Sequence, residues 1–221
     1  MFQDSFQISM DEFPWANLWF AMGYRQSIPE KEIADLAKTV VTRLLPQARL
    51  RYMYQLLPAE KLSSRTIRIG GTLFTPEGII CSYLDGMEEA CLFVATAGSE
   101  FDSALKELNA EGDIVADFIA DSLGTVLAEL AVDRMEHCFD DRQDHSMSYS
   151  PGYCNWNIRE QQLLFPMFPA SPCGITLSES SLMTPEKSVS GFLAFGEKLH
   201  RQPYHCDICK NKNCYKRRES N

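Results

Sequence analysis

The feature that most constrains the fold is a nearly continuous apolar run from Ala90 to Ala97. A strand that is buried on both faces has such a run, whereas a strand with one face in water alternates apolar and polar residues. The segment from Arg49 to Leu57 alternates in this way. The sequence therefore predicts a central buried strand at 90–97 and a half-buried strand at 49–57.

The longest predicted helix runs from Asp113 to about Cys138. Its apolar residues recur at helical spacing and form one stripe, which consists of Val115, Ile119, Leu123, Val126 and Leu130. Glu129 lies on the border of this stripe, about 80° from its centre at roughly 100° per residue. A carboxylate in that position can face a ligand cleft or, as is more common for charged residues, solvent.

Shorter segments complete the pattern. Ser27 to Glu30 has the form of a capping box and predicts the start of a helix. Thr66 to Phe74 predicts a strand in which Gly70-Gly71 marks a bulge or a close backbone approach. Two late strands are predicted at 174–180 and 188–195. Early strands, helices and late strands in this order favour an α+β fold over a regular alternation of strands and helices.

Composition excludes several classes of protein. The 221 residues are 45% hydrophobic, which is enough for a globular core, and their net charge of −9 argues against a nucleic-acid-binding protein. No run of about 18 apolar residues predicts a membrane span, and the acidic N-terminus lacks the features of a signal peptide. We therefore expect a cytoplasmic protein, in which a disulfide framework is the weaker explanation for the eight cysteines.

Three regions follow from these patterns. Residues 1–26 are rich in aromatic side chains and are expected to form an N-terminal arm packed on the domain surface. Residues 27–196 hold the predicted strands and helices and form the α+β domain. Residues 197–221 form a hydrophilic, basic tail that contains three cysteines.

Two further segments carry a recognisable pattern, Tyr149–Trp156 (YSPGYCNW) and Gly174–Gly196 (GITLSESSLMTPEKSVSGFLAFG). Together they resemble the activation module of cobalamin-dependent methionine synthase, and the match covers about residues 90–196. The resemblance implies that module's α+β fold, a twisted antiparallel sheet with helices packed against it. It also implies the module's task, which is to bind S-adenosylmethionine and supply its methyl group to reset an oxidised cobalamin.

The resemblance implies a binding site at the turn. Pro151, Gly152 and Tyr153 match the turn that contacts S-adenosylmethionine, and Tyr153 offers a flat ring for an adenine or a sulfonium. Glu129 aligns with a helix carboxylate that reaches the amino group of the ligand. The family has an arginine three residues before the proline, where this chain has Ser148. Serine cannot replace the bidentate grip of a guanidinium on a carboxylate, so we expect S-adenosylmethionine to bind weakly or not at all.

The tail contains a possible metal-binding pattern. Cys206, Cys209 and Cys214 are separated by two and four residues, a spacing that thiolate–metal sites use. Neighbouring lysines and arginines would lower the thiol pKa values. The spacing fits zinc, an iron–sulfur cluster or plain reduced thiols. The fourth ligand of a metal could be Cys154, Cys173, His200, His205 or none of these.

The implied function is that of an accessory protein in the reductive reactivation of a cobalamin-dependent methionine synthase or another corrinoid methyltransferase. The cobalamin would sit only on the partner, and its reduced cobalt would attack the sulfonium methyl, so no catalytic residue is expected in this chain. The cleft should lie between the SPGY turn (residues 150–153) and the strands from Gly174 to Phe195, with the helix of Glu129 as its wall. Two alternatives are a non-catalytic binding module that has lost S-adenosylmethionine and an iron–sulfur redox activator of a corrinoid protein.

Overall fold

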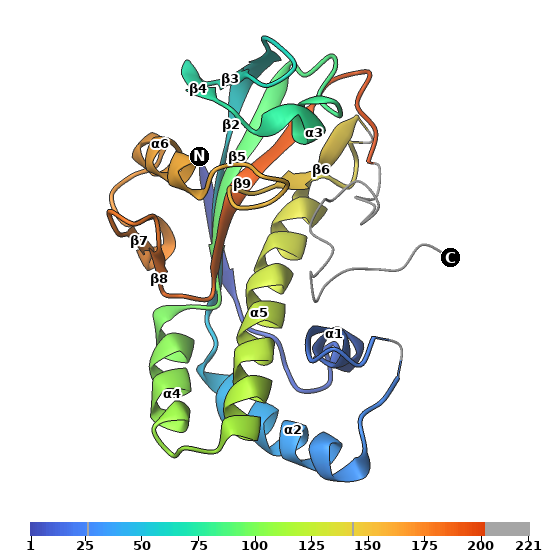
Figure 1. Ribbon diagram of the computed structural model, residues 1–221, viewed down its shortest axis with the longest axis vertical. Helices are drawn as coiled ribbons and strands as arrows, with labels where there is room; N and C mark the ends of the chain where they lie inside the picture. The colour runs from blue at the N-terminus through green and yellow to red at the C-terminus, as the bar shows by residue number, and fades with distance from the viewer. Residues whose placement is uncertain (26, 143, 202–221) are drawn as a thin grey trace.

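The computed structural model describes residues 1–25, 27–142 and 144–201. An antiparallel sheet forms the centre of the molecule (Figure 1) and, within these residues, has seven strands. Its order is β4-β3-β2-β5-β9-β6, and β1 also pairs with β2. The strand bounds are β1 Phe2–Phe6, β2 Leu50–Lys61, β3 Ile67–Ile69, β4 Thr72–Phe74, β5 Glu89–Thr96, β6 His145–Tyr149 and β9 Ser188–Phe195. A separate two-stranded sheet consists of β7 Thr176–Leu177 and β8 Met183–Thr184.

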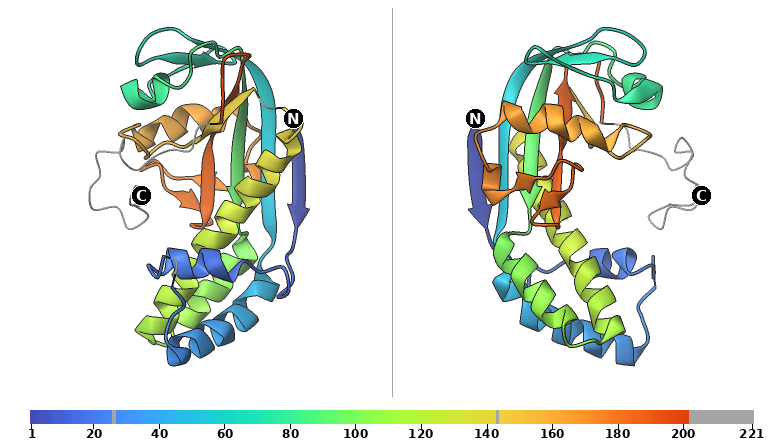
Figure 2. Two further views of the ribbon diagram at one scale, coloured as in Figure 1. Left: turned by 90° about the vertical axis from the view of Figure 1, so that its right-hand side faces the viewer. Right: turned by 60° about the vertical axis from the view of Figure 1, so that its left-hand side comes forward.

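Helices pack on both faces of the main sheet (Figure 2). The helices that share the first hydrophobic core are α1 Trp15–Ala21, α2 Lys31–Leu44, α4 Ser99–Asn109 and α5 Ile114–Glu136. Those that contribute to the second core are α3 Glu77–Cys81 and α6 Gln161–Leu164. Short 3-10 turns lie at Leu45–Gln47, His137–Phe139, Ile158–Glu160, Phe165–Met167 and Pro172–Gly174. The fold is therefore α+β with an antiparallel sheet and packed helices, as predicted.

Strand β5 is the central buried strand that the apolar run predicted. It pairs with β2 on one side and with β9 on the other. Its side chains alternate between the two cores, so that Phe93 packs into the first and Leu92 and Val94 into the second. A strand placed in this way needs apolar residues at every position, which explains its lack of alternation.

Helix α5 forms the longest wall of the first core. The Asp113 carboxylate caps its N-terminus by accepting hydrogen bonds from the backbone N–H groups of Val115 (3.0 Å) and Ala116 (3.1 Å). The helix packs against β2, β5 and β9. Ile119 and Leu123 of the predicted stripe are fully buried, whereas Val115 in the first turn is exposed. The side of α5 that carries Glu129 and Asp133 is exposed.

The N-terminal segment adds to the sheet and to the first core. Strand β1 pairs with the first half of β2, from Phe2 opposite Tyr54 to Phe6 opposite Leu50. Helix α1 packs against α5, and Leu18 is completely buried between them and the rest of the core. Residues 1–26, expected to form a surface arm, thereby supply one edge strand and one helix.

Two local predictions were wrong, and a third was confirmed in part. Thr66 to Phe74 is a hairpin of β3 and β4, because Gly70 and Gly71 both have positive φ angles (53° and 90°) and reverse the chain. The Ser27 hydroxyl donates to the carbonyl oxygen of Tyr24 (2.6 Å) instead of capping α2, which begins at Lys31. The late strand predicted at 188–195 is β9, whereas in the segment 174–180 only Thr176–Leu177 forms a strand, which pairs with β8 outside the main sheet.

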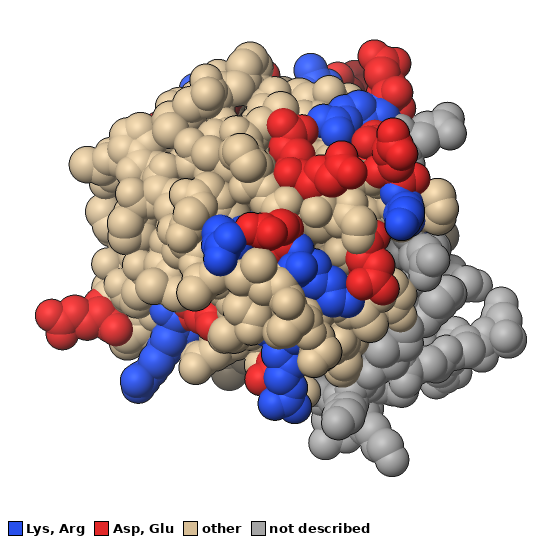
Figure 3. Space-filling view, turned by 90° about the horizontal axis from the view of Figure 1, so that it is seen from above, with Lys and Arg blue, Asp and Glu red and all other residues tan. Residues whose placement is uncertain are grey.

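Charged side chains are interspersed at the upper end of the molecule. Seen from above, basic groups lie next to acidic ones among the coloured residues (Figure 3). Ion pairs of the β2–β3 region, between Arg68 and Glu60 and between Lys61 and Asp85, belong to this pattern. Such exposed pairs add little stability. In the same described residues, no helix has the length and apolar character needed to cross a bilayer.

Candidate functional site

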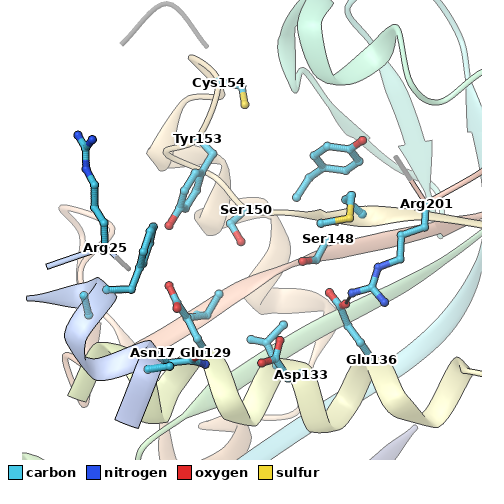
Figure 4. Close-up of a pocket in the computed structure, with 17 residues that line it drawn as sticks. Asn17, Arg25, Glu129, Asp133, Glu136, Ser148, Ser150, Tyr153, Cys154 and Arg201 are labelled. Carbon is cyan, nitrogen blue, oxygen red and sulfur yellow. Dashed lines mark hydrogen bonds and ion pairs between the residues drawn. The ribbon is translucent and has the colours of Figure 1, made fainter. Parts of the chain in front are cut away.

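A cavity of about 630 Å³ lies between α1, α5 and the SPGY turn (Figure 4). Its polar lining comes mainly from Glu129, Asp133 and Glu136 of α5, from Ser148 and Ser150 at the end of β6, and from Tyr153, Arg25 and Arg201. Ala16, Asn17 and Phe20 of α1 form the opposite wall. This volume falls within the range of small-molecule sites in proteins.

The turn is closed by its own backbone. The Gly152 N–H donates to the Trp156 carbonyl oxygen (2.8 Å), and the Trp156 N–H donates to the Tyr153 carbonyl oxygen (2.7 Å). Gly152 has a φ of 97°, a conformation that glycine adopts without strain. Cys154 and Asn155 also have positive φ angles (53° and 67°). The backbone between 150 and 156 is therefore held in one compact shape.

Trp156 anchors this turn in the second core. Its side chain is 2% exposed and packs edge-on against the rings of Phe74 and Phe192. The indole N–H donates to the Glu160 carboxylate (2.6 Å), which also accepts from the backbone N–H of Thr75 (2.8 Å). With the tryptophan fixed, the ring of Tyr153 stays on the surface, 56% exposed, where it lines the cavity.

Strand β6 brings Ser148 to the cavity and approaches β9 very closely. Ser148 lies opposite Leu193 in the pairing of these strands. A side chain at Gly191 of β9 would overlap the carbonyl oxygen of Tyr149 and lie 3.0 Å from the Ser150 hydroxyl. Glycine at this position therefore permits the spacing that sets β6, and with it the turn, against the sheet.

The cavity wall formed by α5 is acidic. Glu129, Asp133 and Glu136 are four and three residues apart, so their side chains share one face of the helix. The pKa of the Asp133 carboxyl is raised. The larger cause is burial, which removes water from the carboxyl, and the smaller one is the negative charge of Glu136 and Glu129. Glu136 is buried and accepts a hydrogen bond from the guanidinium of Arg201 (2.9 Å). A wall of this charge favours a ligand with positive groups.

The structure brings several of the predicted residues together. Glu129, Ser148 and Tyr153 all line the cavity, and α5 forms its wall as expected. Pro151 is buried and Gly152 is exposed, and neither is among the residues that line the cavity, so these two shape the turn. Of the strands from 174 to 195, only β9 reaches the cavity. The β7–β8 sheet is separate from the main sheet, and its strand β8 lines a different hollow together with Asp102 and Lys106 of α4.

Sequence reasoning missed four parts of the lining. Asp133 and Glu136 follow Glu129 at helical spacing, and that signal could have found them. The α1 residues and Arg201 carry no such signal, because they reach the cavity from opposite ends of the chain. Their positions depend on how distant elements pack, which no local pattern encodes.

The three tail cysteines, Cys206, Cys209 and Cys214, lie outside the described residues. In the described part of the chain, no group of three His, Cys, Asp or Glu side chains is arranged to hold a metal. Cys173, one of the two cysteines considered above as a fourth ligand, is a free thiol. Burial raises the pKa of the Cys173 thiol to about 11, which keeps it protonated at neutral pH.

Comparisons with known proteins agree with this architecture. The model of the family "Vitamin B12 dependent methionine synthase, activation domain" matches residues 80–219. The chain belongs to this family. Its role is accordingly linked to methionine synthase reactivation.

One solved structure with the same fold is described as the crystal structure of the MetH reactivation domain bound to AdoHcy. It matches with a TM-score of 0.64 and 16% sequence identity, over 93% of this chain and 81% of that chain. At this identity the likeness establishes the fold alone. A comparison with curated proteins found no match.

In this activation-domain family member, much of the second sequence segment supports the sheet. The carbonyl oxygen of Ser178 accepts from the Ser181 N–H (2.9 Å), and the Ser178 hydroxyl accepts from the Leu182 N–H (3.0 Å). The Ser188 hydroxyl donates to the carbonyl oxygen of Pro185 (2.7 Å). These bonds order the connection that leads into β9, so the segment acts on the cavity mainly by positioning β9 and β6.

Proposed function

We propose that this chain is an accessory protein that presents S-adenosylmethionine for the reductive reactivation of a cobalamin-dependent methionine synthase or another corrinoid methyltransferase. The observation that carries the proposal is the cavity in which Glu129, Asp133 and the ring of Tyr153 meet. S-adenosylmethionine has a positive sulfonium and a positive ammonium, which suit an acidic wall and an aromatic face.

The chemistry fits the residues of the cavity. The partner's cobalamin would supply the nucleophile, and S-adenosylmethionine would supply the methyl group. This chain would then bind the ligand, orient its sulfonium towards the open side of the cavity and exclude water. The transfer moves no proton at the sulfonium, so the cavity needs no general acid or base.

Calorimetric titration of the full chain with S-adenosylmethionine tests the proposal. We expect weak but saturable binding, and we expect Glu129→Gln to weaken it roughly tenfold further, because one charge-assisted hydrogen bond to the ammonium is lost. Glu107→Gln is the matched control, since Glu107 is exposed on α4 and does not line the cavity. Equal affinities of Glu129→Gln and the unaltered protein would place the ligand elsewhere.

A reactivation assay extends the test to the partner. Addition of the chain and S-adenosylmethionine to an oxidised corrinoid methyltransferase, with a chemical reductant, should restore turnover. The Glu129→Gln chain should restore less at the same ligand concentration, and the Glu107→Gln chain should match the unaltered one. Recovery of turnover without the added chain would contradict the proposed accessory role.

One observation favours a second candidate, a binding module of the same fold that no longer uses S-adenosylmethionine. Ser148 offers a hydroxyl and no charge where the resemblance implies an arginine. In that case the titration would show no saturation at millimolar ligand, and the reactivation assay would show no recovery of turnover that depends on the chain. The same two experiments therefore separate the candidates.

A further inference from the structure

The acidic face of α5 meets a positive side chain, Arg201, at one end of the cavity. Glu129 and Asp133 present carboxylates, and the next acidic position, Glu136, is covered by the guanidinium of Arg201. Asp133 and Glu136 are three residues apart, which is about 4.5 Å along a helix axis. An α-amino acid carries its ammonium and its carboxylate on one carbon, so acidic and basic side chains that lie close together at one end of a cavity can bind both groups.

Arg201 can bind a second carboxylate in addition to that of Glu136. The Glu136 side chain is 8% exposed, and a buried carboxylate needs a positive partner. The Arg201 side chain is 52% exposed, and the described contact with Glu136 uses one N–H of its fork. A guanidinium has five N–H donors, so donors remain for a second carboxylate from the cavity side.

The position of Arg201 distinguishes it from the other arginine that lines the cavity. Figure 4 places Arg25 at the end of the cavity near Tyr153, and Arg201 at the end with Glu136. A ligand whose ammonium lies against Glu129 and Asp133 would extend its carboxylate towards Arg201. Ser148 borders the same end but has no charge to offer.

We propose that Arg201 binds the carboxylate of the amino-acid end of the ligand, and that Asp133 and Glu129 bind its ammonium. The inference rests on the proposed function, because it assumes S-adenosylmethionine as the occupant. It assigns the specificity for a zwitterionic amino-acid end to a residue that follows the last strand, 53 positions after Ser148. In this assignment Arg201 takes the role of the arginine that is missing at position 148, whose absence predicted weak binding.

The test compares two ligands, S-adenosylmethionine and its decarboxylated form, by calorimetric titration of the full chain. Arg201→Gln should weaken binding of S-adenosylmethionine by roughly tenfold to a hundredfold. The same substitution should leave the affinity for the decarboxylated ligand within about twofold, because that ligand has no carboxylate to lose. Arg159→Gln removes one positive charge from a residue that does not line the cavity and is the matched control.

A second pair of variants guards against a purely structural effect. Arg201→Gln leaves Glu136 buried without its described partner and is expected to lower the melting temperature. Adding Glu136→Gln should recover the melting temperature without recovering the affinity for S-adenosylmethionine. Adding Ser148→Arg to Arg201→Gln should recover the affinity in part, since it returns a guanidinium to the same end of the cavity.

The outcomes are distinct. An equal loss of affinity for both ligands in Arg201→Gln, or recovery of S-adenosylmethionine binding by Glu136→Gln, would show that Arg201 only supports the fold and would overturn the assignment. Unchanged binding of S-adenosylmethionine in Arg201→Gln would also overturn it while leaving the proposed function intact. If the unaltered chain binds neither ligand, the proposed function fails, and the assignment fails with it.

Discussion

Replacing Gly191 by alanine tests how strongly the close approach of β6 to β9 depends on a residue without a side chain. The new methyl group would overlap the carbonyl oxygen of Tyr149 and lie 3.0 Å from the Ser150 hydroxyl and 3.1 Å from the ring of Phe93. The first obstacle is backbone, which cannot rotate away as a side chain can. Strand β6 would have to move outwards, and its pairing with β9 would weaken.

The expected cost follows from overpacking of a buried contact, which is about 1–3 kcal/mol. In a chain of this length, each kcal/mol lowers the melting temperature by roughly 2–4 °C. We therefore expect Gly191→Ala to melt roughly 2–12 °C below the unaltered protein. Thermal unfolding followed by far-UV circular dichroism, with urea unfolding as a second measurement, gives the difference.

The neighbouring residue provides a matched control. Ser190 is 1% exposed, and its hydroxyl has no hydrogen-bond partner among the described residues. Ser190→Ala removes an unsatisfied polar group from the same strand and should shift the free energy of unfolding by no more than about 0.5 kcal/mol, or raise it slightly. If Gly191→Ala melts within about 1 °C of the Ser190→Ala protein, the close approach does not constrain β6, and the reasoning fails.

Three further predictions concern the ligand and the tail. Ser148→Arg in the otherwise unaltered chain should tighten S-adenosylmethionine binding by no more than about tenfold, because Arg201 already supplies one guanidinium; weaker binding in a titration would contradict this. The affinity should rise with pH from the ordinary carboxyl range upwards and then level off, because the raised pKa of Asp133 keeps this carboxyl protonated at pH values where an ordinary aspartate is ionised, and only its ionised form pairs with an ammonium. Asp133→Asn should flatten this pH profile, and a profile that stays unchanged would exclude Asp133. Cys206, Cys209 and Cys214 should bind zinc or an iron–sulfur cluster in anaerobically purified protein, as measured by elemental analysis and visible absorption, and a triple serine variant should lose it; material without metal or absorbance would leave plain thiols.

The parts of the fold that local patterns encode were predictable. An eight-residue apolar run can only be satisfied between two covered faces, so β5 could be placed at the centre of the sheet. The stripe of α5 and its Asp113 cap located the longest helix to within a few residues. The order of residues in the SPGY turn predicted a tight reversal, and Gly152 adopts the positive φ that it requires.

The parts of the fold that depend on packing between distant segments could not be predicted from local patterns. Gly70-Gly71 fits a bulge and a hairpin equally well, and the choice depends on whether the chain pairs with itself or with another strand. Helix α1 has seven residues with one of them fully buried, too few for a periodic signal. Arg201 carries no pattern at all, since its place beside Glu136 follows from the path of the chain after β9.

Strand β1 has a consequence for how this protein can be prepared. It covers the outer edge of β2 from Leu50 to Tyr54, while β3 covers the same edge from Ala59 to Lys61. A fragment that starts at residue 27, where the sequence suggests a domain boundary, would leave half of that edge with unpaired N–H and carbonyl groups. Exposed edges of this kind recruit strands from other molecules. Such a fragment should therefore self-associate on storage, and it would also lack the part of the first core that helix α1 supplies.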